Sequence, residues 1–205
     1  TIREQGYTPG LAPTRNLVAV KAPVFSMSKL KGVDTFLGPE MKSTGEVMGI
    51  DRTYEGAVAK ALIAAGLHVP ERSNVLLSIA DRDKADAIGL VRGLAATGHT
   101  IYATAGTASM IRAMGIEAVQ VEKRLSGASG MTVVDVIENG TVAAVVNTVT
   151  GDRKTLQDGF HIRRAAVERR VPCFTSLDTA RAAVESLEAG DSAYSVMTMK
   201  EYLEG

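Results

Sequence analysis

The chain lacks several features that would define its function class at once. It has no tryptophan and one cysteine, and its 23 Lys and Arg are balanced by 23 Asp and Glu, so no overall field draws it to nucleic acid or a membrane surface. No apolar run approaches the roughly 20 residues that a membrane helix needs, and no secretory signal opens the sequence. Cys173 stands among apolar residues without an internal disulfide partner, which favours a structural role in a reducing compartment. We therefore expect a cytoplasmic protein with neither nucleic-acid nor membrane partners.

Familiar catalytic patterns are also missing. The sequence has no nucleophile elbow, P-loop or CxxC pair. Its three histidines, His68, His99 and His161, do not have the spacing of metal ligands. No pair of acidic residues is placed at the ends of predicted strands. These absences favour a binding domain over a catalyst and predict no metal site in the chain.

From residue 74 onward, apolar runs alternate with helical patterns. Strands are predicted at residues 75–77, 100–103, 118–121, 142–146 and 172–175, and helices at 83–97, 106–114, 132–138, 160–170 and 178–188. Strands alternating with helices imply right-handed crossovers between parallel neighbours. The fold class is therefore α/β, a three-layer α/β/α sandwich with a five-stranded, mainly parallel sheet.

The first third of the chain reads differently. Residues 17–25 form a predicted strand in which Pro23 indicates an edge or an end, and residues 26–49 have no evident periodicity. Residues 54–65 predict a helix that ends at Gly66. The first 50 residues are too few to bury a core of their own. We divide the chain into residues 1–66, the end of a larger domain with a linker helix, and residues 67–205, a separate domain.

Hydroxyls, an amide and ammonium groups follow four of the predicted strands. In open parallel sheets, ligands bind beyond the carboxyl ends of the strands, and Gly106 at a strand-to-helix turn would let the backbone approach an anion. This chemistry suits a phosphate-bearing small molecule. The candidate residues are Ser78, Lys84, Thr104, Gly106, Thr107, Lys123, Asn147, Thr148 and Thr150.

Each candidate also has a plainer interpretation. Thr104 or Thr107 would serve equally as a helix cap, the lysines as solvated charges, and residues 147–150 as a turn. Lys84 falls in the first turn of a predicted helix, where a cation opposes the helix dipole, so a nearby anion would explain it better. Arg163 and Arg164 point in different directions on a helix, which favours internal ion pairing or a subunit contact over one shared ligand.

One long motif carries a family resemblance. The run LGPEMKSTGEVMG at residues 37–49 closely resembles the end of the second ATP-grasp unit in the carbamoyl-phosphate synthase large-chain family. Residues 20–25 and 32–34 match the final strand and loop of that unit. The remainder resembles the methylglyoxal-synthase-like domain at the carboxyl end of the same family, so the resemblance covers essentially the whole chain.

The resemblance implies a regulatory domain that binds nucleotide effectors such as UMP, an inhibitor, or IMP, an activator. It places the phosphate at Lys84, Thr104, Gly106 and Thr107, with Lys123 nearby. The ribose and base side falls to Ser78, Asn147, Thr148 and Thr150, with Asp158 closing the pocket. The whole enzyme of that family makes carbamoyl phosphate for pyrimidine and arginine biosynthesis from bicarbonate, ammonia from a glutaminase small subunit, and two ATP with Mg²⁺ or Mn²⁺. This fragment itself is expected to hold no cofactor and to be non-catalytic.

The chain departs from the enteric pattern of the family at several positions. Ala105 stands in place of a histidine, and Val149-Thr150 in place of Thr-Ser, which bears on the choice of effector. Ala22 and Phe174 match two acidic positions of an ornithine site, so ornithine activation is not expected. Two alternatives remain open: a methylglyoxal-synthase-type lyase, which needs an aspartate base where this chain has residues 147–150, and an oligomerisation module using Arg163, Arg164 and an exposed tail at residues 194–203.

Overall fold

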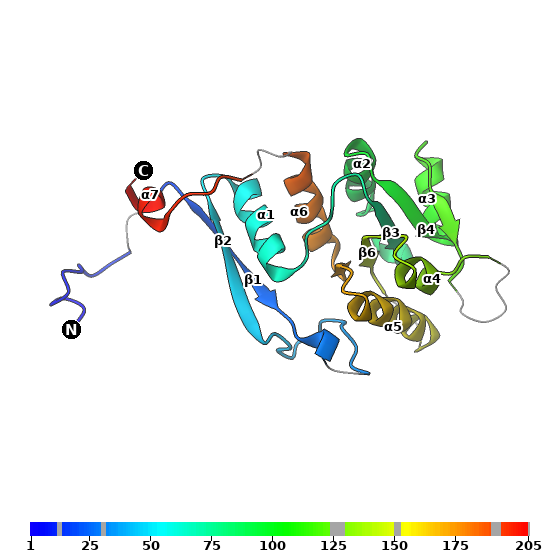
Figure 1. Cartoon of the computed structure of the whole chain (residues 1–205), viewed down its shortest axis with the longest axis horizontal. Coiled ribbons are helices and arrows are strands. Elements are labelled where there is room, and N and C mark those ends of the chain that lie inside the picture. Colours follow the sequence, from blue (N-terminus) through cyan, green and yellow to red (C-terminus); the bar gives the residue numbers. More distant parts are fainter. Residues whose placement is uncertain (12–13, 30–31, 124–129, 150–152, 190–193, 205) are drawn as a thin grey trace.

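The computed structural model describes residues 1–11, 14–29, 32–123, 130–149, 153–189 and 194–204. Two sheets are present in this part of the chain, a two-stranded hairpin and a five-stranded sheet (Figure 1). None of the described helices combines the length and apolarity needed to cross a bilayer.

The sequence predicts a five-stranded, mainly parallel sheet, and all strand pairs of the observed sheet are parallel. Its order is β5-β4-β3-β6-β7, so the first strand of the domain lies at the centre and the chain crosses to the other side of it between β5 and β6. Leu76 of β3 pairs with Tyr102 on one side and with Val145 on the other. The strands are β3 (Asn74–Ser78), β4 (Thr100–Thr104), β5 (Val119–Val121), β6 (Ala144–Asn147) and β7 (Cys173–Phe174).

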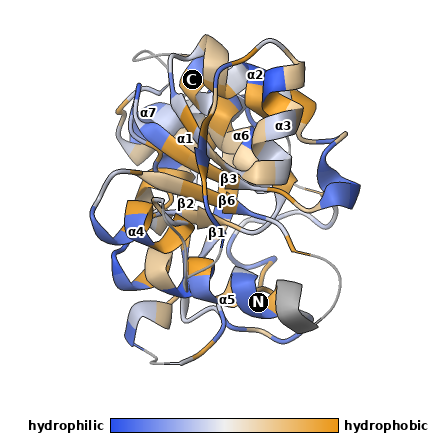
Figure 2. Cartoon of the chain, turned by 90° about the vertical axis from the view of Figure 1, so that its right-hand side faces the viewer, coloured by the Kyte–Doolittle hydropathy of each residue, from blue (hydrophilic) through white to orange (hydrophobic). Residues whose placement is uncertain are grey.

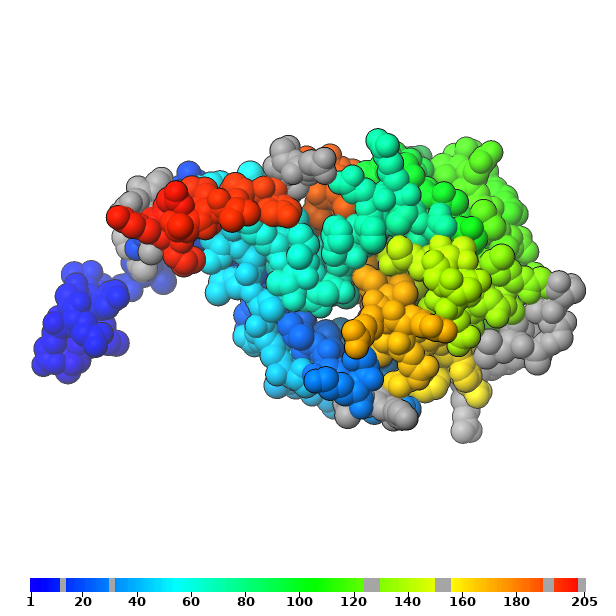
Figure 3. Space-filling model, in the orientation of Figure 1, coloured from blue at the N-terminus to red at the C-terminus, as the bar shows by residue number. Residues whose placement is uncertain are grey.

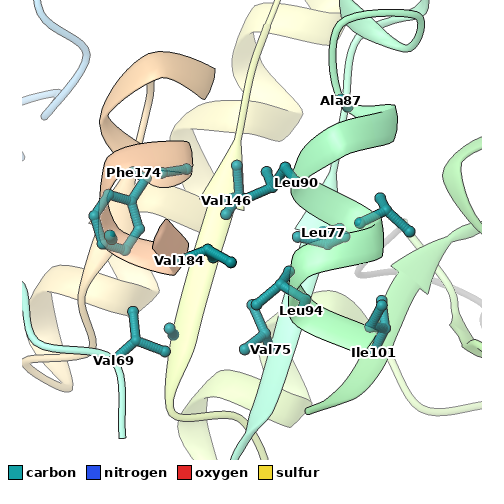
Figure 4. Packing of buried hydrophobic residues seen from close by; sticks show 14 of the residues in the cluster. Val69, Val75, Leu77, Ala87, Leu90, Leu94, Ile101, Val146, Phe174 and Val184 are labelled. Carbon is teal, nitrogen blue, oxygen red and sulfur yellow. The ribbon is translucent and has the colours of Figure 1, made fainter. Parts of the chain in front are cut away.

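Alternation of side chains along β3 builds two separate cores. Val75 and Leu77 face a cluster formed with α2 (Ile88–Ala96), α3 (Ala105–Ala113) and α6 (Leu177–Glu188). Leu76 faces the opposite cluster, formed with α4 (Val133–Glu138) and α5 (Arg153–Glu168). Figure 2 shows helices on both sides of the sheet, and Figure 4 shows Leu90 and Leu94 of α2 beside Leu77 and Val75. The three-layer α/β/α prediction is confirmed.

The first unit is a hairpin covered by one helix. Strand β1 (Val18–Val24) pairs antiparallel with β2 (Gly45–Asp51), from Val18 opposite Asp51 to Val24 opposite Gly45. Helix α1 (Tyr54–Ala65) has the predicted bounds; Gly56 N–H donates to the Thr53 hydroxyl at its start, and Gly66 ends it with a φ of 72°. Val58 and Leu62 of α1 share the core cluster of β3 and α6, so the unit is packed onto the larger domain.

Strand β2 corrects the prediction of an irregular stretch at residues 26–49. Its glycines and exposed Glu46 and Met48 mask a strand period, and the pairing with β1 supplies the order that local propensity does not. Gly49 is required at its position because a Cβ there would overlap the Ala57 carbonyl oxygen of α1. The stretch also contains a single 3-10 turn, η1 (Met27–Lys29).

Two helix boundaries also differ from prediction. The helix predicted to begin at residue 83 begins at Ile88, because a 3-10 turn, η2 (Asp81–Asp83), follows β3 first and Lys84 ends it. Helix α5 starts at Arg153 rather than at residue 160. Polar residues in its first two turns conceal the apolar period on which the prediction depended.

The carboxyl-terminal segment returns to the first unit (Figure 3). Ser195 N–H donates to the Asp51 carboxylate at 3.0 Å, and the Lys60 ammonium lies 2.8 Å from the same carboxylate and 2.7 Å from the Tyr202 hydroxyl. Tyr202, in α7 (Met199–Glu204), is only 4% exposed. The expectation of an exposed tail is therefore wrong for Tyr202, which packs against α1.

Candidate functional site

The carboxyl ends of β3 and β6 lie side by side at the point where the strand order reverses. Ser78 pairs with Asn147 in the ladder, and a ligand of an open α/β sheet is expected outside such a reversal point. Four of the predicted site residues are buried at the carboxyl ends of β3, β4 and β6, namely Ser78, Thr104, Asn147 and Thr148. The structure thus brings the predicted polar residues to one edge of the sheet.

Hydrogen bonds tie the loop after β3 to the end of β6. Ala80 N–H donates to the Thr148 hydroxyl at 2.9 Å, and Thr148 N–H donates to the Ser78 carbonyl at 3.1 Å. A longer bond of 3.5 Å runs from the Asn147 amide nitrogen to the same carbonyl. These bonds fix the strand ends before any ligand is present, so the edge is preorganised.

Thr107 is held in the same way from the other side. Its hydroxyl accepts a bond from Ile79 N–H at 3.1 Å and another from the Thr104 hydroxyl at 3.3 Å. Thr104 precedes α3 but makes no side-chain cap bond to it. The cap interpretation of Thr104 therefore does not hold, and both hydroxyls position the β3 and β4 ends.

The sequence predicts Lys84 in the first turn of the helix that follows β3, but Lys84 precedes that helix, α2. Its side chain lies instead near the start of α3. Its ammonium lies 3.1 Å from the place that a Cβ on Gly106 would occupy, at the first turn of α3. Helix α3 has no acidic residue in its first turn, although a helix start favours negative charge. The ammonium is instead paired with the Asp81 carboxylate at 2.6 Å.

Lys123 acts on the same carboxylate. The bond from Lys84 and the charges of Lys84 and Lys123 together lower the pKa of Asp81 below its ordinary value. The charges of two predicted phosphate-binding lysines, 39 positions apart in the sequence, thus both stabilise the Asp81 carboxylate. Of the two, the Lys84 ammonium lies next to the start of α3, and an ammonium at a helix start can help to hold a phosphate group.

Arg163 holds the Asn147 side chain of the candidate site in place from the buried side, a role that the sequence did not reveal. Its guanidinium, 1% exposed, donates to the Asn147 amide oxygen at 3.0 Å and to both Asp34 carboxylate oxygens, at 2.8 and 2.6 Å. The Phe36 ring lies 5.5 Å from the guanidinium carbon. Gly159, one turn earlier on α5, makes room for this contact, since a Cβ there would overlap Val149 and lie 2.7 Å from Arg163 Nη1.

Ion pairs within the chain account for both Arg163 and Arg164. Arg164 pairs with Glu168 one turn along α5, so the expectation of internal ion pairing is confirmed for both. The subunit-contact alternative is wrong for Arg163, which is buried. Burial alone would raise the pKa of Asp34, but the bonds from Arg163 and from Phe36 N–H lower it overall. The Gly159 and Arg163 spacing of one helical turn is the signal in the sequence from which this contact could have been sought.

The structure gives less information about the remaining predicted site residues. Asp158 lies on α5 next to Gly159 and is half-buried, while Thr150 falls outside the described residues. Thr148 also lines a cavity of about 620 Å³ together with Phe36 and Arg82. The phosphate and ribose assignments stay predictions.

Ala22 and Phe174 line one cavity of about 600 Å³ between β1, α1 and the segment after α5. Two positions 152 apart in the sequence thus line the same cavity, and neither carries a charge. Cys173 lines the same cavity, and burial raises the pKa of its thiol to about 12. A reactive thiolate is therefore not available there. Among the described residues, no group of three His, Cys, Asp or Glu side chains is placed to hold a metal ion.

Comparison with known proteins agrees with this geometry. The family model of the MGS-like domain matches residues 86–175, which include β4, β5, β6 and most of the candidate site. These residues form an MGS-like domain. The match does not include Lys84, the hairpin unit or β3, although β3 is the central strand of the same sheet.

A relative covers the whole chain. The carbamoyl phosphate synthase large chain of Thermomicrobium roseum is 54% identical over 202 residues, which are 98% of this chain and 19% of the relative. The resemblance found in residues 37–49 is thereby confirmed along nearly the full length, and the chain spans about a fifth of the relative it matches. A solved methylglyoxal synthase from Elizabethkingia anophelis is 17% identical with a TM-score of 0.43, covering 67% of this chain and 93% of that one.

Proposed function

We propose that the MGS-like domain binds a nucleotide effector of the UMP or IMP type and regulates a carbamoyl phosphate synthase to which the chain contributes. The observation that carries the proposal is the Lys84 ammonium beside Gly106 at the start of α3; the charge of Lys123 also contributes to the lowered pKa of Asp81, the partner of Lys84. The phosphate would lie there. Ser78, Asn147 and Thr148, at the adjoining strand ends, would face the ribose and base, and Asp158 would close the pocket; Thr150, which falls outside the described residues, stays a predicted member of the same group.

The wider role follows from the relative's name and the resemblance. The whole enzyme would make carbamoyl phosphate from bicarbonate, ammonia supplied by a glutaminase subunit, and two ATP, with Mg²⁺ or Mn²⁺ held outside this chain. Residues 1–66 would be the end of its ATP-grasp domain. Effector binding would alter that domain through the contacts of the hairpin unit; such coupling is typically about 1–3 kcal/mol. The product would serve pyrimidine and arginine biosynthesis in the cytoplasm, and self-association is compatible with this role.

The lyase alternative finds less support. Its proton abstraction needs a carboxylate base at the pocket, and the end of β6 carries Asn147 and Thr148, whose side chains bond to Arg163 and to Ala80 N–H. Methylglyoxal formation from dihydroxyacetone phosphate would overturn this preference.

The test is a thermal-shift and calorimetric titration of the chain with UMP and with IMP. A ligand at 100 times its dissociation constant stabilises a fold by about 2.7 kcal/mol. The matched variants are Lys84→Ala and Lys21→Ala, since Lys21 lies in the exposed Glu46 pair on the hairpin. We expect Lys84→Ala to weaken binding at least about tenfold, the value of a charge-assisted bond, and Lys21→Ala to change nothing. No binding of either nucleotide, or equal loss in both variants, would refute the proposal.

A further inference from the structure

One carboxylate occupies the place where the phosphate is expected. Asp81 Oδ1 lies 2.6 Å from Lys84 Nζ across the 3-10 turn η2, and the Asp81 side chain is 93% exposed against 25% for Lys84. Within the described part of the chain, Lys84 is the one ion-pair partner of this carboxylate. The carboxylate can therefore leave without breaking another side-chain contact.

The place that the Lys84 ammonium occupies, at the start of helix α3, favours a negative charge rather than a positive one. The Lys84 ammonium lies beside Gly106 at the start of a nine-residue helix that has neither an acidic first turn nor a side-chain cap. A cation there opposes the helix dipole. The Asp81 carboxylate supplies the missing negative charge through its ion pair with Lys84, and the charge of Lys123 also helps to lower the pKa of Asp81.

We propose that Asp81 is an internal counter-ion of the effector pocket, which holds Lys84 in the empty state and is displaced by the phosphate of the ligand. The inference rests on the proposed function of the same site. A phosphate dianion and the Asp81 carboxylate repel each other at one ammonium, so binding requires the carboxylate to turn into solvent. The pocket consequently favours dianionic ligands, because a ligand with a single carboxylate would only replace the contact that it displaces.

An exposed ion pair changes an equilibrium constant only modestly, by roughly 1.4- to 5-fold. Asp81→Asn is therefore expected to bind UMP or IMP about two- to fivefold more tightly than the parent chain, as measured by calorimetry. The control is Asp83→Asn, two positions away, which removes the same charge but whose carboxylate bonds to Arg82 rather than to Lys84. Uridine, which lacks the phosphate, should bind both variants as it binds the parent chain.

The outcomes separate the two proposals. Tighter nucleotide binding in Asp81→Asn alone supports the counter-ion role. Unchanged or weaker binding in Asp81→Asn, or an equal gain in Asp83→Asn, overturns that role while leaving the effector site in place. Absence of nucleotide binding to the parent chain and to Asp81→Asn overturns the proposed function itself.

Discussion

The guanidinium of Arg163 donates hydrogen bonds to both carboxylate oxygens of Asp34, while its third nitrogen donates to the amide oxygen of Asn147. One buried side chain thereby joins helix α5, the end of strand β6 and the segment between β1 and β2. Lys42 extends the contact by donating to the Phe36 carbonyl at 2.7 Å. The amino-terminal segment is thus fastened to the candidate site by a specific ionic contact.

Asp34→Asn should lower the free energy of unfolding by about 1–3 kcal/mol. Loss of one partner of a buried pair costs about 3–5 kcal/mol, and we reduce this because the Asp34 side chain is 38% exposed. In a chain of this size each kcal/mol corresponds to roughly 2–4 °C in Tm, so calorimetry should register the change. Adding Arg163→Met should recover part of the loss, because no unpaired charge then remains. A further loss in the double variant would contradict the role of the pair.

Gly159→Ala should destabilise the fold by about 1–3 kcal/mol, as overpacking of a filled interior does. The new methyl group would overlap Val149 and press on Arg163 and Asn147. Gly89→Ala, in α2, is the matched control because nothing lies within 4 Å of its Cβ position; it should be stabilising by up to about 1 kcal/mol. Chemical denaturation of both variants distinguishes crowding from helix propensity, since equal effects would exclude crowding at Gly159.

Stability should fall in acid through Asp51. Burial alone would raise its pKa, but the bonds from Lys60, Ser195 and Arg52 lower the pKa of Asp51 below its ordinary value of 3.8. A carboxyl with a lower pKa in the folded chain contributes stability that is complete above the unfolded pKa and is lost as pH falls through the folded one. Urea midpoints should decline below about pH 4, and Asp51→Asn should flatten that decline. Glu46→Gln, which removes an exposed pair with Lys21, is expected to leave the profile nearly unchanged.

Cys173 should react slowly with thiol reagents in the native chain. Burial raises the pKa of its thiol to about 12, so very little thiolate exists near pH 8. Labelling with a chromogenic disulfide at pH 8 should be complete within seconds in denaturant and at least tenfold slower without it. Fast native labelling would show that the sulfur is accessible and would contradict its structural role.

The sequence predicted the large domain well because most of its elements have a clear local signal. The strands of the parallel sheet are short apolar runs, and Gly66 and Gly115 end their helices in the left-handed conformation. Strand β2 could not be found in this way, since its order comes from pairing with β1 and from the fit of Gly49 against α1. The Asp34–Arg163 contact is equally non-local, joining positions 129 apart. For the site, residue types at strand ends predicted the location. The contacts of Asp81 with Lys84 and of Arg163 with Asn147 could be found only from the structure.

The return of the last segment onto Asp51 has a consequence for the order in which the chain becomes stable. The contact between Asp51 and Ser195 joins positions 144 apart, and closing so long a loop delays the contacts that depend on it. During synthesis, hairpin β1–β2 and helix α1 leave the ribosome long before Ser195 and Tyr202 exist to bond with Asp51 and Lys60. The growing chain must therefore carry the Asp51 carboxylate without its Ser195 backbone partner until the segment that leads into α7 has been made.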